Sequence, residues 1–247
     1  VRVDGYNHEI IVVDNGSTDE SVSFLKSHFP QVKVLALTEN IRFTGGNNAG
    51  VQMAEHDIVI FLNNDTEVTE GWITPLIKSL ENEKIASVQP KIKNLTHKND
   101  FDYAGASGGF IDIFCYPFCR GRIFNTIEID EDQYNSEIEI FWASGTCFAT
   151  KKDIFIRSGM FDGTFFAHME EIDYHWKSQM LGYKILANPK SVIYHKGGGT
   201  LSYNSTKKTY LNHRNSLIIF FGNHRTTRLL LLCIPRLLLH FISVLFD

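Results

Sequence analysis

The chain has 247 residues, of which 43% are hydrophobic and 21% charged, so it is long enough to bury the core of one large domain or two small ones. This composition excludes collagen, a low-complexity disordered chain and a small disulfide-linked scaffold. The formal net charge of −4 argues against nucleic acid as the main partner, because nucleic-acid-binding domains carry a basic excess.

Four short apolar runs in the first 90 residues predict buried strands, and the segments between them predict helices. The strands are expected at residues 9–13, 32–37, 57–62 and 86–89, and the helices at 21–29, 47–55 and 72–82. This alternation is typical of an α/β domain with a mainly parallel sheet, in which ligands bind beyond the carboxyl ends of the strands. We therefore expect the functional side chains in the loops that follow strands.

The pattern becomes less regular after residue 90. Residues 94–133 are rich in Gly, Asn and aromatic residues, and regular elements then resume. Strands are expected at 139–142, 184–187 and 192–194, and helices at 152–158 and 172–181. No internal repeat and no Pro- or Ser-rich linker marks a domain boundary.

Three predicted strand ends carry polar loops, at residues 14–19, 39–50 and 63–65, that would meet at one edge of the sheet. Asp65 could hold a hard divalent cation through oxygen and leave positions for water and a diphosphate. Asn and Asp also form simple turns, so this segment alone leaves both interpretations open. Two glycines in the second loop would let backbone N–H groups approach a phosphate or a sugar, or would only form a turn.

An acidic cluster opens a predicted helix in the second half of the chain. Glu170, Glu171 and Asp173 follow two phenylalanines and fall in the first helical turn. The helix macrodipole accounts for acidic residues at this place. Three carboxylates in four positions exceed that requirement. Burial and mutual repulsion would raise the pKa of one of them toward the range of a general base.

A histidine and three glycines follow the last predicted strand. His195 could be a neutral imidazole ligand, and the glycines at 197–199 could form a mobile flap. A single histidine in such a place can also be purely structural.

The last 41 residues differ from the rest in charge and hydropathy. From Lys207 onward there are six Lys or Arg and one acidic residue, whereas residues 1–206 carry a net charge of −9. Residues 229–246 are almost entirely apolar, but Arg236 and His240 lie where a membrane-spanning helix tolerates charge least. As an amphipathic helix, this tail is expected to lie in a membrane interface with its arginines toward anionic headgroups. The alternative is a helix packed on the body or on another subunit.

Five collinear segments resemble an inverting glycosyltransferase of family 2 with the GT-A fold, in its rhamnosyltransferase-like branch. They are EIIVVDNGSTDES (9–21), ENIRFTGGNNAG (39–50), IVIFLNNDTEV (58–68), the stretch 144–185 and VIYHKGGGT (192–200). The resemblance covers nearly the whole chain. It implies a GT-A domain over 1–205, divided into a nucleotide-binding half (1–90) and an acceptor and catalytic half (91–205), followed by a helical tail (206–247).

The resemblance also implies how the donor would be held. Asp14 and Asn40 match positions that hold the base and ribose of a nucleotide sugar, and Gly46 and Asn47 match the loop along its diphosphate and sugar. Residues 63–65 match the family's D-x-D site, with an asparagine in place of the first carboxylate.

Within that site, Asp65 is the expected metal ligand and Asn64 an expected nucleotide-sugar contact. His195 matches a histidine that completes the metal and diphosphate site in related enzymes. The implied cofactor is a divalent metal, Mg²⁺ or Mn²⁺, that would neutralise the departing diphosphate.

Glu170 and Glu171 match the family's acidic pair, usually Glu-Asp, whose second member is the general base. The implied base is therefore Glu171. Because this member is Glu here instead of Asp, Glu170 and Asp173 stay open as alternatives.

Trp142, Ser144 and Gly145, with the aromatic residues of 103–122, are expected to contact the acceptor, although aromatic residues also fill cores. The implied reaction transfers a sugar from a nucleoside-diphosphate sugar, with dTDP-rhamnose the first expectation, to a hydroxyl of a growing cell-surface or lipid-linked glycan. The expected location is the cytoplasmic face of the membrane, with peripheral contact through the tail.

The chain departs from the family pattern at two places. Arg42 stands where family members usually have Gly, which predicts a stiffer or more cationic loop. The family's opening strand and helix have no counterpart before residue 9, which predicts an incomplete base pocket and an exposed sheet edge. A truncated, non-catalytic relic that binds sugar nucleotide weakly is therefore the alternative. A sugar-1-phosphate nucleotidyltransferase would need a Gly-rich opening loop that we do not find.

Overall fold

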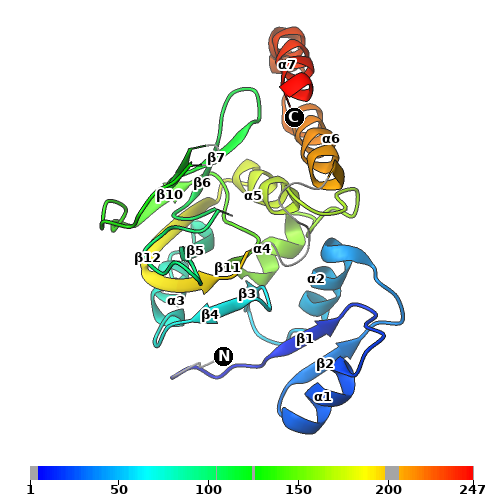
Figure 1. The fold of residues 1–247 in the computed structure, drawn as a ribbon, viewed down its shortest axis with the longest axis vertical. Helices are drawn as coiled ribbons and strands as arrows, with labels where there is room; N and C mark the ends of the chain where they lie inside the picture. Colours follow the sequence, from blue (N-terminus) through cyan, green and yellow to red (C-terminus); the bar gives the residue numbers. More distant parts are fainter. Residues whose placement is uncertain (1–4, 104, 124–125, 198–205, 247) are drawn as a thin grey trace.

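The computed structural model describes residues 5–103, 105–123, 126–197 and 206–246. Its body is a six-stranded sheet in the order β10-β12-β5-β11-β3, with β4 paired to β12 (Figure 1). A two-stranded sheet and a four-stranded sheet stand beside it. The alternation of strands and helices predicted for the first 90 residues is confirmed.

The two-stranded sheet consists of β1 (Ile11–Asp14) and β2 (Lys33–Ala36). The six-stranded sheet consists of β3 (Ile58–Leu62), β4 (Thr66–Val68), β5 (Ile85–Asn94), β10 (Ile138–Ile140), β11 (Cys147–Lys151) and β12 (Lys184–His195). The four-stranded sheet consists of β6 (Gly109–Ile111), β7 (Pro117–Cys119), β8 (Arg122–Ile123) and β9 (Thr126–Ile127). The helices are α1 (Ser21–His28), α2 (Arg42–Met53), α3 (Ile73–Leu80), α4 (Lys152–Arg157), α5 (Glu170–Met180), α6 (Thr206–Asn223) and α7 (Thr226–Phe246).

The strands are of mixed direction, whereas a mainly parallel sheet was predicted. β1 and β2 pair in parallel, as do β5 and β12, but β11 runs antiparallel to both β3 and β5. Parallel neighbours need a crossover connection, usually a helix, and the described residues between β5 and β11 form strands β6 to β10 and no helix. An apolar run in a sequence predicts a strand but carries no information about its direction.

Two apolar clusters cover the faces of the six-stranded sheet. Side chains alternate along β11, so that Cys147 and Ala149 join the cluster under α3 while Phe148 joins the cluster under α4 and α5. Cys147 at the start of β11 is also paired with Leu62 at the end of β3. The loop after β3 and the loop before β11 therefore leave the sheet at the same edge.

The glycine-rich segment lies inside a helix, not in a loop before one as predicted. α2 begins at Arg42 instead of at residue 47. A Cβ added at Gly45 would lie 3.1 Å from the side chain of Ile41, and one added at Gly50 would lie 2.9 Å from Cγ2 of Val13. The glycines thus allow α2 to pack closely on its surroundings, which outweighs their low helix propensity.

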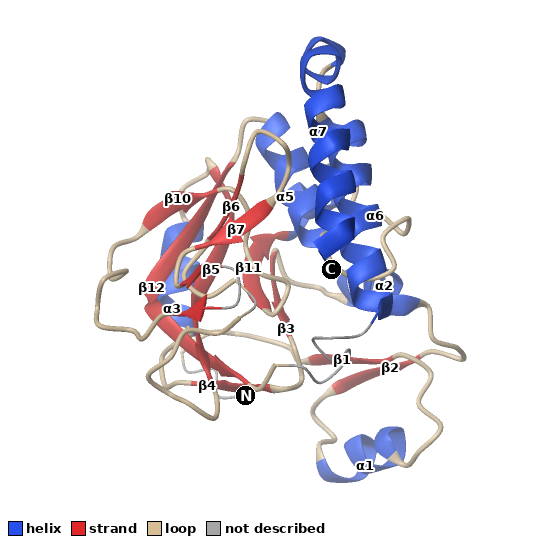
Figure 2. Ribbon diagram, turned by 45° about the horizontal axis from the view of Figure 1, so that its top comes forward, coloured by secondary structure: helices blue, strands red, loops and turns tan. Residues whose placement is uncertain are grey.

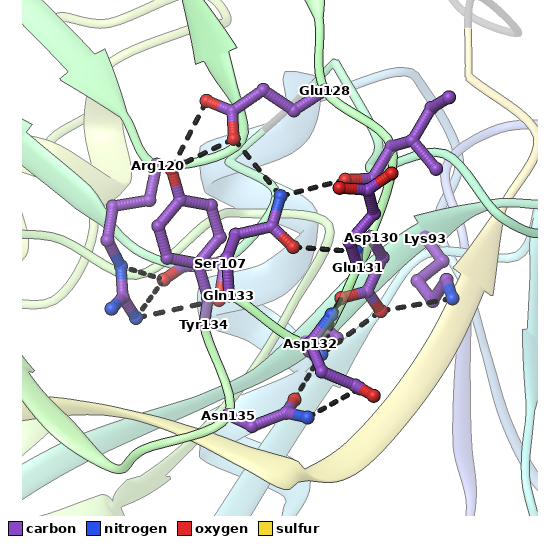
Figure 3. A network of polar contacts seen from close by, with 12 residues as sticks. Lys93, Ser107, Arg120, Glu128, Asp130, Glu131, Asp132, Gln133, Tyr134 and Asn135 are labelled. Atoms are coloured by element: carbon purple, nitrogen blue, oxygen red, sulfur yellow. Dashed lines mark hydrogen bonds and ion pairs between the residues drawn. The ribbon is translucent and has the colours of Figure 1, made fainter.

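The irregular stretch after residue 94 is anchored to the central strand by a polar network (Figure 3). The carboxylate of Asp130 accepts from Lys91 and Lys93 of β5, each at 3.0 Å. Lys91 also donates to Asn135 at 2.6 Å. The side chains of Lys91 and Asp130 are 4% and 6% exposed, so these contacts are buried. They fix residues 128–135 against β5.

The C-terminal helix turns its apolar side outward, and α7 lies alongside α6 (Figure 2). Arg236 of α7 is completely buried and donates to the hydroxyl of Tyr116 at 2.5 Å and to that of Ser216 on α6. Leu231 and Leu238 are 76% and 61% exposed. The prediction that the arginines of this tail point toward anionic headgroups is therefore wrong for Arg236, because its buried guanidinium is bonded to the body.

Candidate active site

The loops that follow β1 and β2 touch each other. Gly16 has a φ of +80°, and a Cβ at this residue would lie 2.7 Å from the carbonyl carbon of Glu39, so only glycine allows the approach. Asp14, at the end of β1, is 8% exposed, and its Oδ2 accepts from the backbone N–H of Ser17 at 3.1 Å. The contact brings Asp14 and Asn40, both predicted to bind the nucleotide, to the same edge of the sheet.

The start of α2 is fixed to these loops. Asn15 donates to the carbonyl of Arg42 and accepts from the N–H of Ile41, both at 2.9 Å. Asn40 is exposed and accepts from the N–H of Arg42 at 2.8 Å. Arg42 has a φ of +71°, a conformation that favours the glycine expected there, and its guanidinium lies 4.9 Å from the ring centroid of Phe166.

The other predicted donor contacts lie in different settings. Gly46 is buried, with a Cβ position 3.4 Å from the amide nitrogen of Asn15. Asn47 donates to the carbonyl of Phe43 in its own helix at 2.9 Å. Asn64 is exposed in the loop after β3. Gly46 therefore has a packing role in addition to the position predicted for it.

Asp65, His195 and Asp102 form a line of polar contacts where β3 and β12 end. Nε2 of His195 lies 3.2 Å from Oδ1 of Asp65, and Nδ1 lies 3.1 Å from Oδ1 of Asp102. The side chains of His195 and Asp102 are 8% and 1% exposed, and that of Asp65 is 24% exposed. Burial lowers the pKa of His195, but the hydrogen bond and charge of Asp102, together with Asp65, raise it above its ordinary value overall.

The donor set at this place suits a divalent cation. When Nδ1–H of His195 donates to Asp102, the Nε2 lone pair faces Asp65, so an imidazole nitrogen and a carboxylate oxygen meet. Over the part of the chain that the structure describes, no three His, Cys, Asp or Glu side chains gather closely enough to hold a metal. The remaining ligands would be water and substrate oxygens, as is common for Mg²⁺ bound with phosphates. The predicted pair of Asp65 and His195 fits this chemistry.

The acidic pair opens α5 after two residues of left-handed conformation, His168 and Met169. Glu170 is buried and Glu171 half-buried, and Oε2 of each has no hydrogen-bond partner among the described residues. Burial raises the pKa of Glu171 to about 7, although backbone N–H groups, including that of Gly145, partly offset it. Burial and the charge of Glu171 raise the pKa of Glu170 well above its usual range. Glu171 therefore ionises first.

Asp173, the third acidic candidate, is held by two partners. Its Oδ1 accepts from Asn223 of α6 at 2.9 Å, and its Oδ2 lies 2.6 Å from Nζ of Lys177. The residue is 4% exposed. A paired and buried carboxylate suits a structural role, so the geometry favours Glu171 and Glu170 as candidates for the base.

The loop before β11 lies beside Glu171. A Cβ added at Gly145 would lie 3.8 Å from Cδ of Glu171. Ser144 is buried, and its backbone N–H donates to Oε1 of Gln89 at 2.7 Å. Of the predicted acceptor residues, Gly145 is therefore next to the proposed base, and Ser144 is fixed by the central strand.

Trp142, the third predicted acceptor residue, is buried in the core. It is 6% exposed, its indole N–H donates to the carbonyl of Phe110 at 2.8 Å, and its ring lies against Gly109. Phe118 of the same aromatic stretch is 52% exposed and stacks on Phe110 at 5.7 Å. The exposed ring of Phe118 is more available for stacking than the buried indole.

Short contacts join these groups into one site. The N–H of Asn63 donates to the carbonyl of Thr146 at 3.0 Å, which ties the loop of Asp65 to the loop of Gly145. The ring of Phe43 on α2 lies 3.9 Å from the Cβ position of Gly145. The start of α2, the loops 63–65 and 144–146 and the start of α5 therefore meet.

Several residues that build this site are not predicted by the sequence pattern. Asn15 lies in a predicted strand-end loop, so its position could have indicated it. Asp102 and Gln89 had no such signal, because one lies in the irregular stretch and the other inside a predicted strand. The predicted flap at 197–199 lies mostly outside the described residues.

The sequence profile described as Glycosyl transferase family 2 matches residues 1–159. The chain belongs to this family. The matched region holds the loops of Asp14, Asp65 and Gly145 and ends before the acidic pair on α5. The family expected from the five collinear segments is confirmed.

Two curated relatives show how far the likeness of this family 2 chain extends. It is 27% identical over 217 residues to N-acetylgalactosaminyltransferase 6 of Drosophila melanogaster, an alignment that covers 84% of this chain and 32% of that protein. It is 21% identical over 230 residues to N-acetylglucosaminyl-diphospho-decaprenol L-rhamnosyltransferase of Mycobacterium tuberculosis, covering 87% of this chain and 75% of the relative. The chain thus spans about a third of the first relative's length.

Among solved structures, the crystal structure of GalNAc-T7 with UDP, GalNAc and Mn²⁺ is similar, with a TM-score of 0.60 and 18% sequence identity. The likeness covers 76% of this chain and 37% of GalNAc-T7. At this identity it concerns the fold, and the predicted GT-A fold of the family 2 chain is confirmed.

Proposed function

We propose that this chain is an inverting glycosyltransferase that moves a sugar from a nucleoside-diphosphate sugar to a hydroxyl of an acceptor glycan. One observation carries the proposal. Glu170 and Glu171, whose pKa values are raised, lie beside the loop 144–146, and this loop is hydrogen-bonded to the loop 63–65 that carries Asp65, the partner of His195. Glycosyl transfer from a diphosphate needs both, a base for the acceptor and a site for the charged leaving group.

Glu171 acts as the base in this proposal. Near neutral pH it is partly ionised while Glu170 stays protonated, and its Oε2 has no partner among the described residues. The acceptor oxygen attacks the anomeric carbon as its proton passes to Glu171. The bond from that carbon to the diphosphate oxygen breaks, and its electron pair leaves with the diphosphate. A positioned base contributes about 10²- to 10⁴-fold to the rate.

In this proposal the diphosphate leaving group binds at the ends of β3 and β12. Asp65 and His195 would hold Mg²⁺ or Mn²⁺, which stabilises the charge of the departing diphosphate when bound. Asp102 keeps the imidazole of His195 oriented toward Asp65. The Mn²⁺ and UDP in the GalNAc-T7 structure support the assignment. Asp14 and Asn40 would hold the base and ribose in the touching loops.

The relatives support two donor classes. The chain covers three quarters of the L-rhamnosyltransferase, whose name specifies an N-acetylglucosaminyl-diphospho-decaprenol acceptor, so we favour dTDP-rhamnose and a lipid-linked glycan. The N-acetylgalactosaminyltransferase relatives make a UDP-linked N-acetylhexosamine the second candidate.

A lipid-linked acceptor agrees with the outward apolar face of α7. Among the described residues, one helical segment, 226–244, is long and apolar enough to cross a membrane, with a mean hydropathy of 1.7. Because Arg236 is bonded to the body, we propose that α7 instead lies on the membrane with Leu231 and Leu238 in the lipid. The enzyme would then work at the cytoplasmic face.

The metal and donor part of the proposal is tested by calorimetry. We expect dTDP or UDP to bind the chain in the presence of Mn²⁺, and Asp65→Ala to abolish the Mn²⁺-dependent part of the affinity. Unchanged affinity in Asp65→Ala would reject the metal assignment.

A non-catalytic relic remains the second candidate, because β1 pairs only with β2 among the described residues, so the predicted nucleotide loops rest on a sheet of two strands. Failure of the unmodified chain to bind either nucleotide at millimolar concentration would favour this relic over the enzyme.

A further inference from the structure

We infer that Asn215 of α6 is a positioning residue that holds the backbone turn from which Glu170 and Glu171 are presented. The catalytic meaning of this inference rests on the proposed function, whereas its geometry does not. None of the five collinear segments that resemble the family includes α6 or Asn215.

Asn215 is completely buried, and its side-chain amide is hydrogen-bonded to the loop before α5. Its Nδ2 donates to the carbonyl of Ala167 at 2.8 Å and to that of His168 at 2.7 Å. Its neighbour Arg214 donates to the carbonyl of Thr164 at 2.8 Å and to Oδ1 of Asn215 at 3.2 Å. Two consecutive residues of α6 therefore hold three carbonyl groups of one loop.

The turn that follows needs this restraint. His168 and Met169 have φ values of +69° and +72°, which residues other than glycine rarely adopt. Two such residues in succession persist only where the surrounding structure fixes them. Because α5 starts directly after Met169, the turn sets the direction in which the carboxylates of Glu170 and Glu171 leave the backbone.

α6 holds the start of α5 at a second point. Asn223 donates to Oδ1 of Asp173 at 2.9 Å, in the same first turn of α5 as the acidic pair. Between Asn215 and Asn223, Ile219 and Phe220 of α6 belong to a buried apolar cluster. The same cluster includes Phe165, Met169 and Ile172 from the loop before α5 and from α5 itself. The apolar contacts fix the distance between the two helices, and the amides fix the orientation of the peptide planes.

An orienting role makes a specific prediction about which step depends on Asn215. The residues proposed to bind the donor, Asp14 and Asp65, lie on β1 and in the loop after β3, whereas the amide of Asn215 donates to Ala167 and His168 in the loop before α5. Loss of its amide donors should therefore impair transfer and leave donor binding intact. A residue needed only for general stability would instead lower the melting temperature and affect both.

The decisive variant is Asn215→Asp, which keeps the size but turns an acceptor toward two carbonyl oxygens. We expect kcat to fall by at least about tenfold, because small misplacements of a catalytic group have large effects. The donor KM and the Mn²⁺-dependent affinity for the nucleoside diphosphate should stay within about twofold. Hydrogen exchange of the amides at 165–173 should become faster. If Asn215→Asp does not fold, Asn215→Ser, which keeps one donor, replaces it.

Ser216→Ala is the matched control, because Ser216 is the next residue and is also buried. The substitution removes the hydrogen bond that Arg236 donates to Ser216 and leaves the bonds to the loop before α5 in place. We expect this variant to keep wild-type kcat and wild-type exchange at 165–173. Equal effects of the two variants, or wild-type exchange in Asn215→Asp, would overturn the inference. If the unmodified chain turns over no donor, the proposed function fails, and the exchange data alone decide the positioning role.

Discussion

Two adjacent glutamates on the first turn of α5 differ in their surroundings, and the difference assigns them separate roles. Glu170 is 5% exposed, and its pKa is raised by burial and by the charge of its neighbour. Glu171 is half-buried beside Gly145 and loses its proton first. At neutral pH Glu171 is therefore partly ionised while Glu170 stays protonated, so the negative charge of the pair lies beside the loop 144–146.

This asymmetry predicts the pH dependence of turnover and the effect of Glu170→Gln. Because Glu171 must be ionised, kcat/KM should rise with pH with a midpoint near 7, well above the ordinary value of 4.5 for a glutamate. Glu170→Gln imitates the protonated form, so it should keep this midpoint and most of the activity. The pH profiles of both proteins check this. A midpoint near 4.5, or a Glu170→Gln variant without turnover, would contradict the assignment.

The residues at strand ends could be predicted because strand topology brings such positions together. Asp65 and His195 follow different predicted strands, and the structure places them 3.2 Å apart. The partner of His195 could not be predicted, because Asp102 lies in a stretch without periodicity whose path depends on long-range contacts. The burial of the Trp142 ring could not be predicted for the same reason, because the ring packs against Gly109, more than 30 positions earlier in the chain.

At the scale of elements, the irregular stretch between β5 and β10 is held by buried charges. Asp130 lies between two lysines of β5, Lys91 and Lys93. Burial raises the pKa of Asp130, but the two lysines outweigh it, so the folded protein holds this pKa below its ordinary value. The stabilisation is therefore complete above the pKa of an unfolded aspartate, about 3.9, and is lost as the pH falls from there toward the folded pKa.

Asp130→Asn should lower the free energy of unfolding by about 3 kcal/mol at pH 7, because it removes the carboxylate that neutralises Lys91 and Lys93 in a buried setting. Urea unfolding between pH 7 and pH 3 measures the effect, and the difference from wild type should shrink below about pH 4. Glu139→Gln, which breaks the exposed pair with Lys184, is the control and should cost less than about 1 kcal/mol. Equal losses in both variants would show that burial of the Asp130 pairs has no energetic consequence.

Most elements could be predicted from periodicity, whereas their ends and directions could not. α2 begins before its predicted start, because Gly45 and Gly46 are typical of a loop and only their packing on neighbouring side chains explains a helix there. The antiparallel course of β11 depends on how the preceding stretch returns to the sheet. These features arise from contacts between distant segments.

At the scale of the whole molecule, α7 carries most of the exposed apolar surface at the C-terminus. The periodicity of its sequence predicted a polar stripe but could not tell which way it faces. The structure turns Arg236 toward α6 and the leucines outward. The contact proposed with the membrane is therefore made by the apolar face, with Arg225 and Arg228 exposed at the start of the helix.

This arrangement predicts binding to lipid vesicles. Flotation with vesicles of phosphatidylcholine and phosphatidylglycerol should recover the unmodified chain, and Leu231→Asp with Leu238→Asp should reduce recovery at least about tenfold, because each charge opposes burial in lipid. Tyr210→Asp, on an exposed position of α6, is the control and should bind like wild type. If the double variant floats normally, or only changes the size of an oligomer in solution, α7 contacts a second copy instead.

The central claim is that this family 2 chain transfers sugars with Glu171 as the base. The most direct measurement is single-donor turnover, with nucleotide sugars including dTDP-rhamnose and UDP-N-acetylhexosamines, Mn²⁺ and a lipid-linked glycan acceptor, for wild type and Glu171→Gln. We predict nucleoside diphosphate release and glycan extension with one donor, and at least about 100-fold slower turnover in Glu171→Gln at unchanged donor affinity. Wild-type turnover in Glu171→Gln, or no turnover of any donor by a wild-type chain that binds the nucleotide, would contradict the account.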